Sequence, residues 1–273
     1  MRIRSWIEII RPLNCLMVAL AILIGYLISS SYQLLDLDKL IMAIIAGFLI
    51  TGAGFIFNDA VDVEIDKIVH PTRPLPKGEI DVNTAFLVSL VIFIAGIVFS
   101  IFINVECFLI AIINSIILVV YTEILEKKGI FGNIVISYLT ASSFLFGAFA
   151  AGKIYSLVTW LAIITFLAIL SREIIKDVED LEGDFYGERE TLPMGIGRER
   201  SITIAIFLLG SAMIISILPM FLSLVNLFYS AIIIPNVILG FGAFQAIFNP
   251  KSSRRIIKFG MLLALIVFLL GGD

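Results

Sequence analysis

The sequence is poor in charge and in the residues that usually build soluble catalytic or disulfide-linked domains. Only 15% of its 273 residues are Asp, Glu, Lys or Arg, whereas soluble domains average about 25%. It contains one histidine and two cysteines, Cys15 and Cys107, each inside or beside an apolar run. Two cysteines exclude a disulfide scaffold, and we expect both thiols to be buried and free. The net charge of −3 favours no nucleic-acid partner.

Apolar residues take the place of the missing charge. They make up 60% of the chain, and the mean hydropathy is +1.09. One core of this length cannot bury such an excess, so lipid must solvate much of it. The chain is therefore predicted to be an integral membrane protein. Because a bilayer offers no hydrogen-bond partners to open strand edges, we predict an all-α fold.

Uncharged stretches long enough to cross a bilayer recur along the whole chain, given that a spanning helix needs about 20 apolar residues. The stretches are 12–35, 40–58, 82–105, 107–122, 129–152, 154–171, 201–250 and 259–272. The stretch 201–250 must contain two spans, with the turn near Pro219, Ser223 and Asn226. The sequence thus predicts nine transmembrane helices.

The distribution of basic residues sets the orientation. With the N-terminus in the cytoplasm, 17 of the 19 Lys and Arg residues fall on inner segments, and only Lys39 and Lys153 on outer ones. Such an excess is typical of cytoplasmic loops, so we predict a cell-membrane protein with a cytoplasmic N-terminus. The two longest connections, about 59–81 and 179–200, both fall on the cytoplasmic side, and long loops tend to be functional.

These two loops begin with the same spacing of aspartates, at an offset of 118 residues. The matching residues are Asp59, Asp62 and Asp66 in the first loop and Asp177, Asp180 and Asp184 in the second. Both clusters close a helix that runs toward the cytoplasm, and both are followed by an arginine and a proline. Membrane proteins often contain structural repeats with the working site between them. We therefore expect one membrane domain, 1–273, with a pseudo-repeat of 1–128 and 129–273.

The spacing of the carboxylates also predicts a metal site. Residues three or four apart share a helix face, so each cluster forms a stripe, and two facing stripes would repel unless a cation lay between them. Oxygen ligands suit Mg²⁺, and neither stripe holds a His or Cys that would favour zinc. The predicted metal ligands are Asn58, Asp59, Asp62, Asp66, Asp177, Asp180 and Asp184. The alternative is a solvated loop at the membrane boundary.

Basic residues near the carboxylates predict a phosphorylated ligand. A phosphate group bridged by Mg²⁺ needs positive charge on its remaining oxygens, which Arg supplies through bidentate contacts. The candidates are Arg73, Lys77, Lys127, Lys128, Arg172, Lys176 and Arg189. Each also has an ordinary explanation as part of the cytoplasmic basic excess. Asn14, a few positions into the first span, is a further substrate-binding candidate unless it only bonds a neighbouring helix. His70 is expected to be a surface loop residue.

Together these motifs resemble the UbiA superfamily of intramembrane prenyltransferases over the whole chain. The matching residues are Asn58-Asp-x-x-Asp-x-x-x-Asp66 with Arg73-Pro74-Leu75, Asp177-x-x-Asp180-x-x-x-Asp184 with Thr191-Leu192-Pro193, Arg11-Pro12-x-Asn14, Tyr121 and Gly132-Asn133. The resemblance implies nine helices around a central cavity that opens sideways to lipid and is capped by the two cytoplasmic loops. It also implies that Mg²⁺ on the aspartates binds an isoprenoid diphosphate, whose prenyl chain passes to an acceptor with release of pyrophosphate.

Within the superfamily, the short N-terminus and the run REIIKDVEDLEGD most resemble certain archaeal enzymes. Those enzymes add a geranylgeranyl group to the sn-2 hydroxyl of geranylgeranylglyceryl phosphate, a lipid-phosphate acceptor, in ether-lipid biosynthesis. Lys176 stands where the first motif has Asn58, so the two halves are not chemically equivalent and Lys176 becomes a phosphate-binding candidate.

The expected mechanism assigns roles to four carboxylates and one aromatic ring. Mg²⁺ and the basic residues would stabilise the departing pyrophosphate, and Tyr121 or Tyr138 would stabilise the allylic cation through its ring face. The catalytic carboxylate candidates are Asp62, Asp66, Asp180 and Asp184. One carboxylate of the two clusters would accept the proton of the acceptor hydroxyl, but the sequence does not select it.

Two alternatives stay open. An aromatic quinone precursor could be the acceptor, because nothing in the composition excludes it. A cation transporter could also use paired acidic repeats, but transporter carboxylates tend to lie near the membrane midplane. The carboxylates in this sequence are predicted at the cytoplasmic ends of helices.

Overall fold

A computed structural model describes residues 3–34, 36–125, 129–181 and 190–272. Within these ranges the chain is helical and contains no strand. The helices are α1 (Ile3–Ile10), α2 (Pro12–Ser29), α3 (Leu37–Val61), α4 (Val63–Val69), α5 (Val82–Ile101), α6 (Val105–Val120), the π-helical turn η1 (Tyr121–Leu125), α7 (Ile130–Ala150), α8 (Ser156–Glu179), α10 (Leu192–Ile196), α11 (Arg198–Ile215), α12 (Leu218–Phe221), the 3₁₀ helix η2 (Leu227–Ile232), α13 (Ile233–Phe248) and α14 (Pro250–Gly271). The all-α prediction is confirmed.

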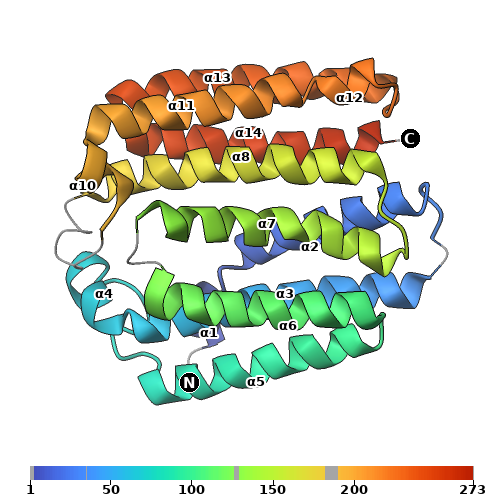
Figure 1. Ribbon diagram of the computed structural model, residues 1–273. Helices are drawn as coiled ribbons and strands as arrows, with labels where there is room; N and C mark the ends of the chain where they lie inside the picture. Colours follow the sequence, from blue (N-terminus) through green and yellow to red (C-terminus); the bar gives the residue numbers. More distant parts are fainter. Residues whose placement is uncertain (1–2, 35, 126–128, 182–189, 273) are drawn as a thin grey trace.

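The long helices lie side by side along a common axis, and the short helices α4 and α10 both lie at the same end of the bundle (Figure 1). Helices α8, α14, α11 and α13 form one side of the bundle, while α3, α6 and α5 form the other. Helices α2 and α7 lie between the two groups and pack directly against each other. The two groups correspond to sequence segments that lie before and after α7.

Two large hydrophobic clusters hold this arrangement together, and both include side chains from α2 and α7. One cluster joins these helices to α8, α11, α13 and α14, with Phe144 and Ile24 among its buried members. The other joins them to α3, α5 and α6, with Ile22, Tyr26 and Phe146 among its buried members. Ile22 and Ile24 on α2 therefore face opposite clusters. The pair of central helices, α2 and α7, thus connects the two sides of the protein.

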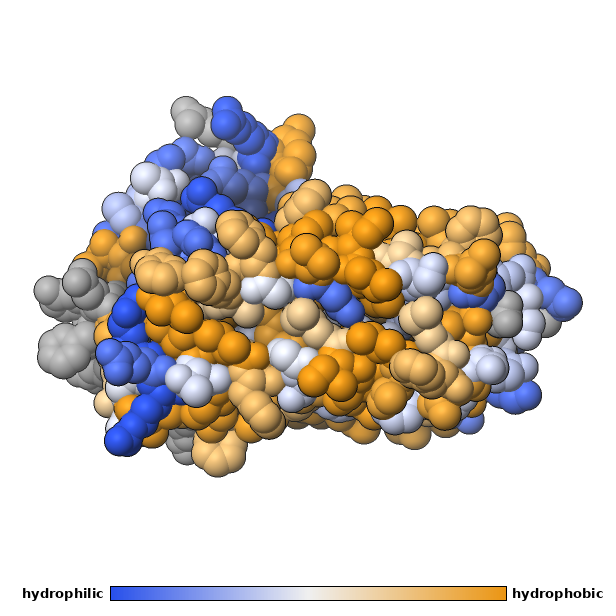
Figure 2. Space-filling model, turned by 90° about the horizontal axis from the view of Figure 1, so that it is seen from above, coloured by the Kyte–Doolittle hydropathy of each residue, from blue (hydrophilic) through white to orange (hydrophobic). Residues whose placement is uncertain are grey.

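Eight helical segments have the length and apolar composition to cross a membrane, counted over the described residues. They coincide with the first eight of the nine predicted spans. The ninth predicted span corresponds to α14, a 22-residue helix whose first half carries Lys251, Arg254, Arg255 and Lys258. Figure 2 shows a broad hydrophobic surface over the middle of the molecule, with hydrophilic residues gathered mainly at the end where α4 and α10 lie. This distribution is the one expected of a bundle solvated by lipid along its length.

The two long polar connections contain more helix, in their described residues, than the sequence suggests. Helix α3 continues to Val61, and α4 follows after the single residue Asp62. In the second connection, α8 continues to Glu179 and the short α10 precedes α11. Charged residues continue both long helices beyond the apolar stretches, so the aspartate clusters lie on helix ends rather than on irregular loop.

The central pair of helices depends on two glycines. A Cβ atom added at Gly147 on α7 would lie 2.0 Å from the carbonyl oxygen of Ile22, and one at Gly25 on α2 would lie 2.0 Å from the carbonyl oxygen of Phe144. Small residues allow such close backbone approach in membrane helix pairs. Any side chain at either position would push α2 and α7 apart and disturb both hydrophobic clusters.

We predict that Gly147→Ala lowers the free energy of unfolding by about 1–3 kcal/mol, the usual range for overpacking a well-packed interior. The matched control is Gly210→Ala on α11, where an added Cβ meets no atom within 4 Å. Thermal unfolding of the detergent-solubilised protein, followed by circular dichroism, compares the two variants. Equal midpoints for both variants would show that the α2–α7 approach does not limit stability.

Candidate active site

The first acidic cluster lies at the junction of α3 and α4, where its aspartates are buried. Asp59, Asp62 and Asp66 are 3%, 6% and 4% exposed. The backbone hydrogen bonds from Asp62 N–H to the Asn58 carbonyl and from Asp66 N–H to the Asp62 carbonyl, at 2.9 and 2.8 Å, keep the helical spacing through the junction. The predicted stripe of Asn58, Asp62 and Asp66 therefore forms, and the Asn58 amide donates to Asp62 at 3.3 Å.

Arginines from two other segments pair with these carboxylates. Arg11, which precedes α2, forms an ion pair with Asp59 and lies 4.8 Å from the ring centre of Phe55. Arg73, in the loop after α4, donates to Asp66 at 2.6 Å and lies 3.7 Å from Asp59. A buried carboxylate is costly unless paired, so these contacts explain how Asp59 and Asp66 are tolerated at the edge of the membrane.

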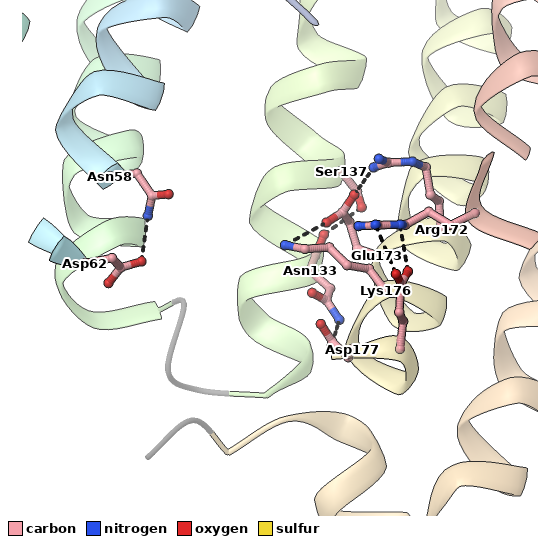
Figure 3. Close-up of polar contacts among 10 residues, drawn as sticks. Asn58, Asp62, Asn133, Ser137, Arg172, Glu173, Lys176 and Asp177 are labelled. Carbon is pink, nitrogen blue, oxygen red and sulfur yellow. Dashed lines mark hydrogen bonds and ion pairs between the residues drawn. The ribbon is translucent and has the colours of Figure 1, made fainter. Parts of the chain in front are cut away.

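The second cluster lies at the end of α8. Asn133 on α7 donates to Asp177 at 2.7 Å, and the buried Glu173 pairs with Arg172. The Lys176 ammonium lies 3.9 Å from Glu173. In the close-up, Asn58 and Asp62 occupy one side of the view and this α8 group the other (Figure 3). Asp180 ends α8, while Asp184 lies outside the described residues.

The backbone is nearly the same at the two matching aspartates. Asp62 ends α3 with φ −85° and ψ 7°, and Asp180 ends α8 with φ −90° and ψ 7°. In each case the N–H group donates to the carbonyl four residues earlier, on Asn58 or Lys176, at 2.9 Å. Equal spacing in the sequence thus corresponds to equal local geometry in both halves of the chain.

His70 lies near charged residues of both clusters. Burial lowers the pKa of its imidazole, and Arg73 lowers that pKa further, whereas the Asp66 and Asp180 carboxylates act in the opposite direction and Lys176 lowers it slightly. His70 directly follows α4 and its side chain is partly buried, and charges of the second cluster act on this loop residue. A single-chain pattern could not reveal this, because the second group of charges comes from α8, more than a hundred residues later.

The donor set fits Mg²⁺ as an ion shared with a ligand. Within the part of the chain that the structure describes, no three His, Cys, Asp or Glu side chains lie close enough to hold a metal ion by themselves. The aspartates instead offer oxygen ligands from separate helix ends. Mg²⁺ is commonly bound by one or two carboxylates together with substrate phosphates and water. The arrangement therefore suits an ion that binds along with a phosphorylated ligand.

The other predicted basic residues and the aromatic candidates differ in how close they lie to the buried carboxylates and in how exposed they are. Arg73, Arg172 and Lys176 lie among the buried carboxylates, whereas Lys77 is exposed in the first connection. Tyr121 opens the π-helical turn after α6 and is half-buried, and Tyr138 on α7 is 39% exposed. Lys127, Lys128 and Arg189 lie outside the described residues.

Several polar contacts at the site have no counterpart among the predicted site residues. Asn14 accepts a hydrogen bond of 2.9 Å from Lys258 on α14, and Arg254, one turn earlier, lies 2.8 Å from Glu179 on α8. Lys258 and Arg254 were missed because basic residues at the start of a membrane helix are already explained by the general excess of Lys and Arg on cytoplasmic segments. Glu173 was missed because it falls outside the repeated aspartate spacing, although the unusual sequence Arg172-Glu173 inside an apolar span was a usable signal.

An apolar cavity lies next to the second cluster. Helices α2, α7, α8, α11, α13 and α14 line it, with Met17, Phe144, Ile169, Met213, Met261 and Phe268 among the contributing side chains. Its free volume is about 70 Å³. Its lining suits a hydrocarbon chain.

Comparison with known proteins is consistent over nearly the full chain. The family model described as the UbiA prenyltransferase family matches residues 18–266. The digeranylgeranylglyceryl phosphate synthase of Methanococcus maripaludis (strain S2) is 39% identical, with 99% of each chain covered. A solved structure concerned with digeranylgeranylglyceryl phosphate synthase in membranes superimposes with a TM-score of 0.80 and 34% identity, covering 98% of each chain.

A more distant structure has the same fold. The UbiA homologue from Archaeoglobus fulgidus, solved with bound GPP and Mg²⁺, superimposes with a TM-score of 0.73 at 18% identity. The superposition covers 97% of this chain and 98% of that one.

We predict that Arg11→Met destabilises the protein by about 2 kcal/mol, because it removes one partner of a buried carboxylate. The double variant Arg11→Met/Asp59→Asn should recover part of that loss, since no buried charge then lacks its partner. Chemical unfolding of the purified protein measures the cycle. The exposed pair Lys39–Asp36 is the control, where Lys39→Met should cost less than about 1 kcal/mol. Equal losses for Arg11→Met and Lys39→Met would contradict the burial argument.

Proposed function

The chain belongs to the UbiA prenyltransferase family and is therefore a prenyltransferase, and we propose that it completes the hydrocarbon part of an archaeal ether lipid. The proposed reaction transfers a geranylgeranyl group from geranylgeranyl diphosphate to the sn-2 hydroxyl of geranylgeranylglyceryl phosphate. Pyrophosphate is the second product. The observation that carries this choice of substrates is the 39% identity, over 99% of both chains, to a relative named digeranylgeranylglyceryl phosphate synthase.

We propose the topology that the basic residues favour, with nine transmembrane helices, a cytoplasmic N-terminus and location in the cell membrane. Helix α14 is the ninth span, and its 22 residues are long enough to cross a bilayer of about 30 Å. Its four basic residues then lie at the cytoplasmic end, beside the two acidic clusters. The pseudo-repeat of 1–128 and 129–273 is supported by the matching helix ends at Asp62 and Asp180.

In this proposal the two acidic clusters would hold Mg²⁺ together with the substrate diphosphate. The ligand set is the one named from the sequence, and when bound, the ion supplies Lewis-acid stabilisation of the leaving pyrophosphate. Binding of a cation also relieves the repulsion between the two groups of buried carboxylates. The diphosphate site is thus formed by the polar ends of α3 and α8, and the packing of the helical bundle holds these two ends in place.

Basic side chains at the site stabilise the charge that develops on the departing diphosphate. Arg73 already lies within hydrogen-bond distance of Asp66, so it can turn toward diphosphate oxygens when that carboxylate engages a cation. Lys176, which lies 3.9 Å from Glu173, is a second candidate for the diphosphate. Lys77, Lys127 and Arg189 remain proposed contributors from the connecting segments. Preorganised positive charge of this kind acts where negative charge increases in the transition state.

The bond changes balance without another reactant. The bond between the allylic carbon of the prenyl chain and the diphosphate oxygen breaks, and a carbon–oxygen ether bond forms to the acceptor hydroxyl. The hydroxyl proton passes to a carboxylate, for which Asp62, Asp66, Asp180 and Asp184 are the candidates. Tyr121 is proposed to face the allylic carbon and stabilise its positive charge through the ring, and the apolar cavity keeps water away from it.

Neither alternative has equal support. A quinone-precursor enzyme would be expected to resemble enzymes of that class most, whereas the similar relative is named for lipid synthesis. A transporter would need its carboxylates near the midplane, but Asp62 and Asp180 lie at the ends of α3 and α8.

We predict that purified protein forms a labelled diether phosphate from labelled geranylgeranyl diphosphate and geranylgeranylglyceryl phosphate. No product should form with 4-hydroxybenzoate, and chelation of Mg²⁺ should stop the reaction. Thin-layer chromatography of the extracted lipids measures the product. Prenylation of the aromatic acid alone would overturn the proposed acceptor. Calorimetry provides a second test, in which cation binding is measured with and without diphosphate. An equal affinity for the cation in both cases would favour the transporter.

We predict that Asp62→Ala and Asp180→Ala each lower kcat at least about 100-fold without unfolding the protein, because each removes a metal ligand at a helix end. The matched control is Glu64→Ala in the same segment, whose carboxylate is exposed and pairs with Lys67. Turnover and gel-filtration profiles are compared for the three variants. Near-normal turnover in either aspartate variant would contradict the metal-binding proposal.

A further inference from the structure

The basic residues of α14 form contacts that the proposed diphosphate site does not require. Lys258 donates to the Asn14 amide oxygen at 2.9 Å, so it links α14 to the start of α2. Arg254, one helical turn earlier, lies 2.8 Å from Glu179 on α8. Lys258 also lies within electrostatic reach of Arg254 and of Arg172 on α8. Together with Glu173 and Lys176, which neighbour Arg172 on α8, these side chains form a polar cluster between α2, α8 and α14, which we call the α14 cluster.

The α14 cluster carries more positive than negative charge. Its four cations, Arg172, Lys176, Arg254 and Lys258, face two carboxylates, Glu173 and Glu179. Each carboxylate is already engaged by an arginine. Four cations against two carboxylates leave an excess of two positive charges.

Two of the cations have donor groups that protein atoms do not engage. Among the described residues Lys258 has no carboxylate partner, and the buried Nε atom of Arg172 has no hydrogen-bond partner. Partly buried cations without counter-charge are costly. This cluster therefore has the charge and the donors to receive a doubly charged anion.

The apolar cavity begins one helical turn beyond this cluster on three helices. Met17 follows Asn14 by three residues on α2, and Met261 follows Lys258 by three on α14. On α8, which runs the other way, Ile169 precedes Arg172 by three residues. Residues three apart lie on the same face of a helix, so the polar α14 cluster and the apolar cavity adjoin on these helices. A ligand with an anionic head and a hydrocarbon tail matches this arrangement, with its head at the cluster and its tail toward the cavity.

We propose that Lys258, together with Asn14 and Arg172, binds the phosphate group of the acceptor lipid, and that the acceptor's isoprenoid chain enters the apolar cavity. This inference rests on the proposed function and assigns Arg172, and with it the positive charge of Lys176, to the acceptor rather than to the diphosphate. A phosphate monoester carries close to two negative charges at neutral pH, which equals the excess of the α14 cluster. Lys258 is thereby a specificity-determining residue that selects a phosphorylated acceptor.

The position of the cluster also suits the chemistry. The phosphate of a glycerol phosphate is carried by the carbon next to the one that bears the sn-2 hydroxyl. Holding the phosphate against α14 and α8 places that hydroxyl beside α8, on which Asp177 and Asp180 follow Arg172 by five and eight residues, toward the end of the helix. Anchoring a non-reacting group in this way orients the nucleophile toward the donor carbon.

The test compares Lys258→Met with the matched control Lys251→Met, which makes the same change at an exposed position of α14. Initial rates are measured with one substrate varied at a time. In Lys258→Met the KM for geranylgeranylglyceryl phosphate should rise about 10- to 100-fold, the range for loss of a charged hydrogen bond. The KM for geranylgeranyl diphosphate should change less than about twofold. Lys258→Arg, which keeps the charge, should remain within a few-fold of the unaltered protein.

A second measurement uses geranylgeranylglycerol, the acceptor without its phosphate. The unaltered protein should prefer the phosphorylated acceptor by at least about tenfold in kcat/KM, and Lys258→Met should lose most of that preference. If Lys258→Met does not fold, Lys258→Gln, which can still donate to Asn14, replaces it with the same expected pattern.

A raised KM for the diphosphate alone, or unchanged values for both substrates, would overturn the assignment of the α14 cluster while leaving the transfer reaction intact. Failure of the unaltered protein to use geranylgeranylglyceryl phosphate at all would instead overturn the proposed function, and the inference with it.

Discussion

Burial of several carboxylates at the edge of a membrane is the constraint on which the rest of the structure depends. Asp59, Asp62 and Asp66 are almost fully buried, and a buried carboxylate without a partner is costly. Arg11 and Arg73 supply part of the compensation from outside α3 and α4, and in our account a metal-bound diphosphate supplies the rest. The buried carboxylates therefore favour the binding of a cation together with an anionic ligand. The segments that carry Arg11 and Arg73 are held in place by their ion pairs with these carboxylates.

The apolar part of the bundle sets the geometry of that polar site and provides an apolar cavity for a hydrocarbon chain. Helices α2 and α7 approach so closely at Gly25 and Gly147 that their backbones are in contact, and both hydrophobic clusters are built on them. This central pair fixes the distance between the ends of α3 and α8, where the matching aspartates lie. On the side of α8, α11, α13 and α14 it also leaves an apolar cavity, whose lining suits a hydrocarbon chain and, in the proposed mechanism, would keep water from a reactive carbocation.

The sequence predicts those parts of the structure that follow from local periodicity and charge. Uncharged runs located the spans, and the three- and four-residue spacing of Asn58, Asp62 and Asp66 predicted the stripe that the helix junction forms. Contacts between distant segments were not predictable in the same way. The pairing of Arg11 with Asp59, the influence of charges at the end of α8 on His70, and the bond from Lys258 to Asn14 each require the packing of helices far apart in the chain. Basic residues on α14 were also hidden by a general rule, because the positive-inside excess explains any cytoplasmic lysine without assigning it a task.

The central claim is that a diphosphate binds between the ends of α3 and α8 through metal ions held by both acidic clusters. The most direct measurement is a crystal structure with Mn²⁺ in place of Mg²⁺ and a thio-analogue of geranylgeranyl diphosphate that resists cleavage, with the ions located by anomalous scattering. Our account predicts ion peaks within about 2–2.5 Å of carboxylate oxygens from both clusters, including Asp62 and Asp180, with the diphosphate bridging them. Peaks confined to one cluster, or a diphosphate bound away from both helix ends, would contradict it.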